Sequence, residues 1–333
     1  MNLLKNIATV GGRPAAVTKQ YWLRLGIFAA VVSALAAICL LVILIRMQLR
    51  VFVTPYRNAQ VDAAAATAAL QRPVQDISLT TGDGLQLAGW YSPGAQPQAV
   101  IVVHGINANR MAVLPEASIL AGAGYHLLLL DLRGHGRSQG DQLTYGYREA
   151  LDVLAAIDYL DRRPEVEQIA ALGTSFGGAA VARAAALDPR LQAVIIESSY
   201  SSLPDAVDDA FDNLSFFPRQ PFAPLLIGLA ERRVGVSIRQ VDSARDLATL
   251  SPRAVMIIHG NDDTMFPPRH AQKMYDAAGE PKELWLIEGL GHGNPAIEHE
   301  AEFRARVLSF LERAFAGQGS KTVDGSQETE NRE

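Results

Sequence analysis

The chain has 333 residues, of which 49% are hydrophobic and 20% are charged. This is enough apolar material for a large core, and it excludes a disordered or collagen-like chain. The 30 Lys and Arg residues against 35 Asp and Glu residues give a formal net charge of −5, which argues against a nucleic-acid partner. The single cysteine, Cys39, excludes an intrachain disulfide framework and a cysteine-rich zinc site.

Near the N-terminus, residues 25–45 form an uncharged apolar run, LGIFAAVVSALAAICLLVILI. As a helix that rises about 1.5 Å per residue, this run is long enough to span the roughly 30 Å hydrocarbon core of a bilayer. A cleaved signal peptide is the alternative, but its apolar region is usually shorter, about 7–15 residues, and a small-residue cleavage site follows it. Here the basic segment RMQLR follows, so we predict a single-pass membrane anchor.

The positive charges on the two sides of this run nearly balance. Four basic residues precede it, and three follow it closely, which slightly favours a cytoplasmic location for the N-terminal segment, residues 1–24. We therefore expect the large C-terminal part to lie outside the cytoplasm. Residues 46–73, with an Ala-rich stretch that ends at Pro73, are predicted to form a stalk between the anchor and the domain.

Beyond the stalk, short apolar runs alternate with helical patterns over residues 74–316. The first two runs, 74–81 and 85–91, have alternating polarity and flank a Thr-Gly-Asp-Gly turn, which predicts an antiparallel hairpin. The later runs are almost continuously apolar, as in strands that are buried on both faces of a parallel sheet. These runs lie at 99–105, 126–132, 168–175, 193–199, 254–260 and 283–289. Helical patterns lie at about 110–123, 144–163, 176–187, 267–278 and 297–315.

The pattern predicts an α/β fold with an eight-stranded, mostly parallel sheet and helices on both faces. About fifty residues, 200–250, interrupt the alternation. A structureless loop of that length is unusual in a compact domain, so we expect a small helical cap over the carboxyl ends of the strands. Among its large apolar side chains, Phe222 and Leu226 are candidates for substrate binding. Residues 317–333 contain almost no apolar side chains and are predicted to be a disordered tail.

The sharpest chemical signal is Gly173-Thr174-Ser175-Phe176-Gly177, which follows a predicted strand and opens a predicted helix. In this context a G-x-S-x-G turn places the serine hydroxyl clear of the sheet, and the two glycines remove side chains that would collide there. The N–H groups at the start of the helix point toward developing negative charge. Ser175 is therefore the candidate nucleophile.

A serine nucleophile needs a base to accept its proton and an acid to orient that base. Two aspartates, Asp262 and Asp263, follow the run 254–260, and His292 lies between glycines after the run 283–289. Because both loops follow adjacent predicted strands, they can converge above Ser175. The residues alone leave open which aspartate acts.

Residues 74–315 resemble the α/β-hydrolase superfamily, and in particular the bacterial membrane-anchored serine hydrolases of the esterase, lipase and S33-type peptidase group. The resemblance rests on VVHG (102–105), DLRGHGRS (131–138), GTSFG (173–177), HGNDDTMFP (259–267) and GHG (291–293). It implies that the acid is Asp263, the fifth residue of an H-G-x-x-D-x-x-V-P motif with Phe266 in place of valine. It also implies an oxyanion hole made by the backbone N–H groups of Ile106 and Phe176, and a location in the bacterial inner membrane.

These features predict a serine hydrolase that cleaves carboxylic esters or related acyl bonds of small molecules through an acyl-enzyme, with no cofactor and no metal. The apolar cap favours substrates with hydrophobic acyl chains. Two alternatives remain open. One is an aminopeptidase or amidase of the same fold, and the other is a catalytically silent, membrane-anchored binding protein. The aminopeptidase would need an acidic cluster to hold a free amino terminus, for which the candidates are Asp205, Asp208, Asp209 and Asp212.

Overall fold

The computed structural model describes residues 19–317. Most of the N-terminal segment and nearly all of the predicted tail therefore lie outside the described residues. The chain divides into two compact units, residues 1–49 and residues 50–333. Residues 50–73, which we expected to be part of a stalk, belong to the same unit as the sheet.

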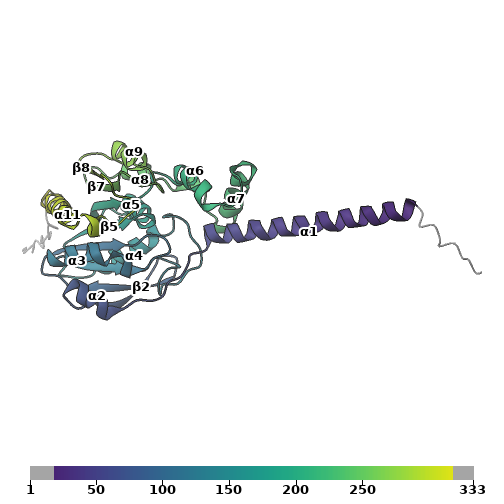
Figure 1. Cartoon of the computed structure of the whole chain (residues 1–333). Coiled ribbons are helices and arrows are strands. Elements are labelled where there is room, and N and C mark those ends of the chain that lie inside the picture. The colour runs from purple at the N-terminus through teal and green to yellow at the C-terminus, as the bar shows by residue number, and fades with distance from the viewer. Residues whose placement is uncertain (1–18, 318–333) are drawn as a thin grey trace, which may run out of the picture. The chain divides into compact units, whose positions relative to one another are not determined.

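In its described part, the first unit is helical. It contains most of helix α1 (Lys19–Val53), the long ribbon labelled in Figure 1. Residues 21–53 of this helix are long and apolar enough to cross a membrane, and none of the most apolar part is buried. A signal sequence passes the same test, so the helix is a candidate membrane anchor by its length and composition.

The second unit is built on one eight-stranded sheet with the spatial order β1-β2-β4-β3-β5-β6-β7-β8 (Figure 1). Strands β1 and β2 form an antiparallel hairpin, β2 also pairs antiparallel with β4, and the remaining pairs are parallel. The predicted sheet and its hairpin are confirmed. The strands are β1 (Gln75–Thr80), β2 (Gln86–Ser92), β3 (Gln98–Val103), β4 (His126–Leu130), β5 (Gln168–Thr174), β6 (Leu191–Glu197), β7 (Ala254–Gly260) and β8 (Lys282–Ile287).

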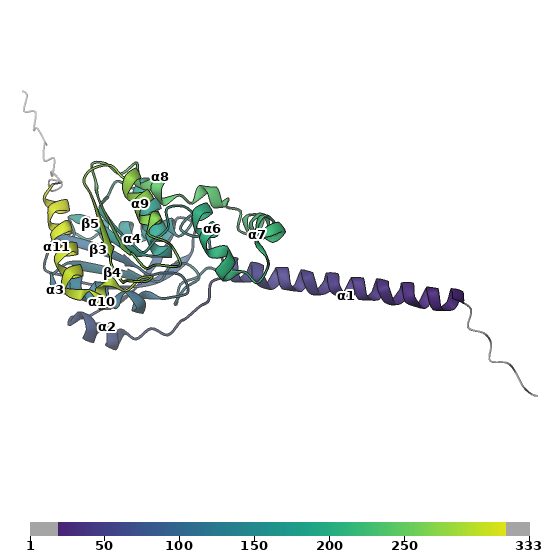
Figure 2. The same cartoon turned by 45° about the horizontal axis from the view of Figure 1, so that its top comes forward.

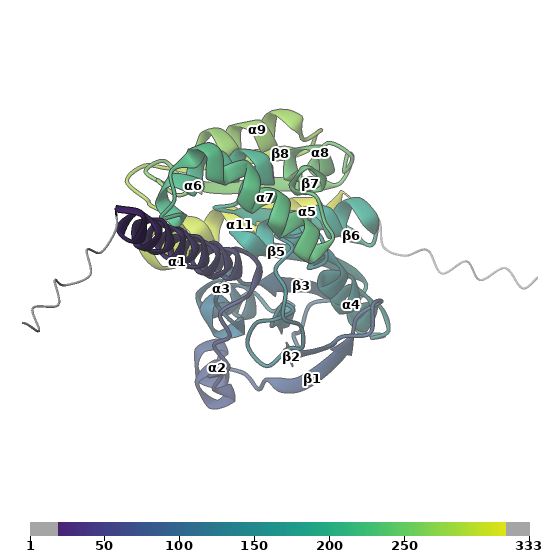
Figure 3. The same ribbon diagram turned by 90° about the vertical axis from the view of Figure 1, so that its right-hand side faces the viewer.

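Helices cover both faces of this sheet, as Figure 3 shows. Side chains of β3 alternate between two apolar cores: Ile101 and Val103 belong to one, and Val100 and Val102 to the other. The first core is covered by α4 (Ala150–Asp161), α5 (Phe176–Leu187), α8 (Ser243–Leu247) and α9 (Arg269–Ala277). The second is covered by α2 (Ala63–Leu70), η1 (Arg110–Val113), α3 (Leu114–Gly122), α10 (Pro295–Glu298) and α11 (Glu300–Ala316). Burial on both faces explains why the parallel strands are continuously apolar in sequence.

The insertion between β6 and β7 is helical, as the sequence predicts. It contains α6 (Leu203–Leu214), α7 (Arg219–Val234) and η2 (Ile238–Gln240), followed by α8. In Figures 1 and 2, α6 and α7 lie on the side of the second unit that is opposite α11. We call residues 200–250 the cap.

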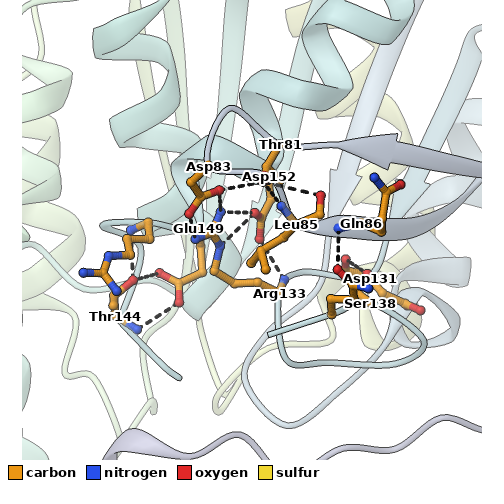
Figure 4. A network of polar contacts seen from close by, with 12 residues as sticks. Thr81, Asp83, Leu85, Gln86, Asp131, Arg133, Ser138, Thr144, Glu149 and Asp152 are labelled. Atoms are coloured by element: carbon orange, nitrogen blue, oxygen red, sulfur yellow. Dashed lines mark hydrogen bonds and ion pairs between the residues drawn. The ribbon is translucent and has the colours of Figure 1, made fainter. Parts of the chain in front are cut away.

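The segment between β4 and α4, residues 131–149, is a loop that a polar network holds in place (Figure 4). The buried Arg133 guanidinium donates to Asp152 Oδ1 through Nε at 2.8 Å and Nη2 at 2.7 Å, and it also pairs with Asp83. The hydrogen bond from Arg133 is the main reason why the pKa of Asp83 falls to about 2. The Asp83 carboxylate therefore stays charged, and Arg133 ties this loop to the hairpin through Asp83 and to α4 through Asp152.

The helix that we predicted over 144–163 begins only at Ala150. The Glu149 carboxylate accepts hydrogen bonds from the N–H groups of Thr144 and Gly146 at 2.9 Å each, which closes residues 144–149 into a turn. At Gly146 the backbone has φ of +98°, and a Cβ there would lie 2.8 Å from Ala179 Cβ, so the turn requires glycine. This tertiary contact overrides the local helical pattern.

Candidate active site

Ser175 lies in the sharp turn between β5 and α5, with φ of 53° and ψ of −118°. Such a backbone is strained for a residue other than glycine, by of order 1–3 kcal/mol, and persists only where the surroundings enforce it. A Cβ at Gly173 would lie 2.5 Å from the Gly177 carbonyl oxygen, and one at Gly177 would lie 2.5 Å from that of His104. The G-x-S-x-G spacing is therefore what allows α5 to pack this closely against β5 and β3.

The structure brings Ser175, His292 and Asp263 together from three loops at the carboxyl ends of β5, β8 and β7. His292 Nε2 lies 3.0 Å from Ser175 Oγ, and His292 Nδ1 lies 2.7 Å from Asp263 Oδ2. The N–H of Gly293 donates to Ser198 Oγ at 3.1 Å, which helps to hold the histidine loop. The His292 side chain is 25% exposed, whereas that of Asp263 is fully buried, so the site opens to solvent on the histidine side.

The Asp263 carboxylate is held by more than His292. Its Oδ1 accepts hydrogen bonds from the N–H groups of Met265 and Phe266 at 2.9 Å each, and His259 Nε2 lies 3.3 Å from Oδ2. Burial alone would raise the pKa of Asp263, but the hydrogen bonds from His259, His292 and the Phe266 N–H outweigh it and hold the pKa well below its usual value. The neighbouring Asp262 is exposed.

His259 is a residue of the site that the sequence analysis included in the HGNDDTMFP motif without giving it a role. Its Nε2 also lies 2.7 Å from the Phe266 carbonyl oxygen, so one N–H faces both this carbonyl and the Asp263 carboxylate. The signal in the sequence was the spacing of four positions between His259 and Asp263, across the tight turn that follows β7. This spacing becomes informative only once the turn after β7 is known to bring the His259 side chain next to the Asp263 carboxylate.

The loop that follows β3, which carries Ile106, lies beside the serine. A Cβ on Gly105 would come within 3.4 Å of Ser175 Cβ. His104 fixes this loop, because its Nδ1 lies 2.7 Å from the Gly105 carbonyl oxygen and its Nε2 accepts from the Leu132 N–H at 3.1 Å. Burial lowers the pKa of His104 to about 3, so this imidazole remains neutral and suits both contacts. Phe176, the residue after Ser175, begins α5.

An apolar cavity of about 120 Å³ lies under the cap, next to these residues. Two residues of its wall contact the site. The Phe266 ring packs against the His292 ring, with 5.3 Å between the ring centres, and the Tyr145 ring packs against the Phe176 ring, with 6.1 Å between the ring centres. The rest of the wall is mostly aliphatic or aromatic. It includes Phe52, Val53, Leu143, Leu203, Phe211, Leu226, Val234 and Ile238.

Of the two cap residues singled out from sequence, Leu226 is buried and lines the cavity. Phe222 does not line it; the Phe222 ring stacks on Phe217, with 4.4 Å between the ring centres. The signal that sequence reasoning missed is outside the cap, because Phe52 and Tyr145 come from segments that precede it by more than fifty residues.

The acidic residues of α6 are engaged with cations wherever the structure describes their side chains. Asp205 pairs with Lys273 at 3.0 Å, and Asp208 pairs with Arg219. Asp209 pairs with Arg269 and accepts from His270 Nε2 at 2.8 Å. The side chain of Asp212 lies outside the described part of the structure.

A strained serine at the turn after the fifth strand, facing a histidine that is backed by a carboxylate on an eight-stranded sheet, is the arrangement found in α/β hydrolases. Residues 94–220 match the family model described as serine aminopeptidase, S33. An uncharacterized protein of Mycobacterium tuberculosis is 30% identical over 250 residues, covering 73% of this chain and 82% of the relative. The chain belongs to the α/β-hydrolase superfamily, in the group that includes the S33-type proteins.

Other relatives and solved structures match a similar share of the chain. The polyketide transferase ATR5 of Stachybotrys chlorohalonatus is 27% identical over 293 residues, covering 71% of this chain and 98% of the relative. The solved structure of the Pyrococcus furiosus esterase Pf2001 matches with a TM-score of 0.65 and 24% identity over 78% of this chain and 98% of that chain. The α/β hydrolase GrgF of a Penicillium species matches with a TM-score of 0.59 and 26% identity over 73% of this chain and 99% of that chain. Together they identify an esterase-like hydrolase fold.

Proposed function

We propose that this protein is a serine hydrolase that cleaves carboxylic esters of hydrophobic acyl chains through an acyl-enzyme intermediate. Ser175 is the nucleophile, His292 the general base and acid, and Asp263 the group that orients the imidazole. The observation that carries the proposal is the continuous contact from Ser175 Oγ through His292 to Asp263, with an apolar cavity beside it.

The proposed reaction has two steps. Ser175 Oγ attacks the ester carbonyl carbon while His292 Nε2 takes the hydroxyl proton, and the same proton then passes to the departing alkoxide. Water repeats the sequence on the acyl-enzyme and releases the carboxylic acid. The negative charge on the carbonyl oxygen would be stabilised by the backbone N–H groups of Ile106 and Phe176, each worth about 3–4 kcal/mol in acyl transfer.

The charges around the cavity favour an ester over the free amino terminus of a peptide. An aminopeptidase needs an anionic group that can accept the substrate ammonium, but Asp205, Asp208 and Asp209 are already paired with cations. The acidic residue in the cavity wall, Glu231, accepts hydrogen bonds from Ser237 Oγ at 2.7 Å and the Ile238 N–H at 2.9 Å. An apolar chain would displace water from the remaining wall, which favours binding by about 0.8 kcal/mol per methylene.

A fluorophosphonate probe together with p-nitrophenyl esters tests the proposal directly. The full chain should be labelled and should hydrolyse the esters, and Ser175→Ala should abolish labelling and lower turnover by about 10⁴–10⁶-fold. Ser118→Ala is the matched control, because this hydroxyl lies on α3 and donates to the Ala69 carbonyl oxygen at 3.0 Å. Labelling that survives in Ser175→Ala, or more than a tenth of the wild-type activity, would exclude Ser175 as the nucleophile. A chain that is not labelled at all would support the silent binding protein instead.

We also propose that α1 anchors the protein in a bacterial inner membrane, with the hydrolase unit outside the cytoplasm. The support is the uncharged run 25–45, its flanking arginines and the slight excess of positive charge on its N-terminal side. The substrate would then be a small acyl compound that is accessible at the membrane.

A further inference from the structure

Phe52 and Val53, the last two residues of α1, form part of the wall of the apolar cavity. We infer that Phe52 is a specificity-determining residue, whose ring sets the length of acyl chain that the cavity accepts. This inference rests on the proposed ester hydrolysis. It makes the end of α1 a part of the substrate site, in addition to any role of the helix as an anchor.

The backbone of these two residues is fixed to the loop between β4 and α4. The N–H of Leu143 donates to the Val53 carbonyl oxygen at 3.0 Å, and the Tyr145 hydroxyl donates to that of Phe52 at 2.7 Å. Val53 is only 5% exposed. Because both carbonyl groups lie near the end of a helix, where intrahelical partners are lacking, these bonds satisfy them and hold the end of α1 in place.

The loop that receives Phe52 is itself rigid and leads to the nucleophile. Glu149 holds the backbone at Thr144, and the Tyr200 hydroxyl donates to the Tyr145 carbonyl oxygen at 2.8 Å (Figure 4 shows Glu149 and Thr144). The Tyr145 ring then packs edge-on against Phe176, the residue next to Ser175. The backbone of Phe52 is therefore held at a fixed position relative to Ser175.

Across the cavity, the Phe52 ring stacks on Phe211 of α6, with 6.4 Å between the ring centres and 26° between the planes. The contact joins the end of α1 to the cap and closes the wall between them. An acyl chain in the cavity ends where it meets this ring, which stacks against Phe211 of the cap. Reducing the ring should lengthen the cavity, and enlarging it should shorten the cavity.

The position in the chain has a practical consequence. Phe52 follows Ile45, the last residue of the uncharged run, by only seven positions. A soluble fragment that begins after Val53 would lack this part of the wall, so the test must use the full chain, purified in detergent.

The experiment measures kcat/KM for p-nitrophenyl esters from acetyl to dodecanoyl with the wild type, Phe52→Ala and Phe52→Trp. Phe52→Ala should move the preferred chain at least two carbons longer. Its ratio of long-chain to short-chain kcat/KM should rise about fifteenfold, the value for two more buried methylenes. Phe52→Trp should move the preference to shorter chains. The acetyl ester, which does not reach the ring, should change less than twofold.

Tyr56→Ala is the matched control, since its aromatic side chain is 70% exposed and lines no part of this cavity. It should keep the wild-type chain-length profile. Active Phe52 variants with an unchanged profile would overturn the inference and leave the proposed hydrolysis standing. If the wild type shows no ester hydrolysis that depends on Ser175, the proposed function itself is refuted. If Phe52→Ala fails to fold, Phe52→Leu and Phe52→Trp decide the same question.

Discussion

Replacing Asp263 with asparagine tests whether this carboxylate orients the histidine. Asp263 Oδ1 accepts two backbone N–H groups, so the amide oxygen of an asparagine must occupy that place. The amide NH₂ then faces His292 Nδ1 where the carboxylate oxygen lies at 2.7 Å in the wild type. A donor at this position forces Nδ1 to accept, and the proton moves to Nε2, which can no longer take the proton of Ser175.

The expected loss in kcat is about 10⁴-fold, as measured for the same substitution in another triad hydrolase, and corresponds to about 5 kcal/mol of transition-state stabilisation. The fold should survive, because an asparagine keeps the shape of the side chain. The pKa of Asp263 lies well below its usual value, so the wild-type carboxylate is charged across the assay range.

The assay is p-nitrophenyl ester hydrolysis by the full chain, with the thermal midpoint as a check on folding. Asp262→Asn is the control, because Asp262 is exposed and differs from Asp263 by one position. It should retain activity within a few-fold of the wild type. Equal losses in the two variants, or a larger loss in Asp262→Asn, would refute the assignment of Asp263.

Three further predictions concern the support of the site, the core and the membrane. His259→Phe removes a hydrogen bond to Asp263, so the lower limb of the pH–activity profile should shift while Ser175 labelling remains; an unchanged profile would contradict the role of His259 in supporting Asp263. Burial, together with the charge of Glu116, raises the pKa of Glu197, and burial raises that of Glu116 to about 7. The folded state therefore keeps protons that the unfolded chain releases above about 4.5, and the free energy of unfolding should fall as pH rises from 4.5 to 7; Glu116→Gln should flatten this slope in thermal melts, and identical slopes would refute it. Alkaline phosphatase fused after Ala316 should be active if the hydrolase unit lies outside the cytoplasm. If only a reporter that works in the cytoplasm is active at the same site, the hydrolase unit lies in the cytoplasm.

Much of the fold is predictable because its signals are local. The strands differ from the predicted runs by at most about two residues at each end, since burial on both faces leaves a continuous apolar run in the sequence. The turn at Ser175 is predictable for a similar reason: its G-x-S-x-G signature lies within five consecutive residues, although the collision that requires glycine at 177 is with the His104 carbonyl. The start of α4 was not predictable, because it depends on the hydrogen bonds of the Glu149 side chain and on the contact of Gly146 with α5.

Sequence alone predicted the sheet, with its strands in order along the chain, and proposed Ser175 and His292 for catalysis, because short motifs at strand ends carry these signals. It left Asp262 and Asp263 open, and the family resemblance pointed to Asp263. Only the tertiary structure decided which apolar side chains meet beside the serine. Phe52 and Tyr145 are 93 positions apart and join through one hydrogen bond, while Phe222, within the cap, packs elsewhere. Hydrophobicity makes a side chain avoid water but has no direction, so its partner depends on how distant segments are packed together.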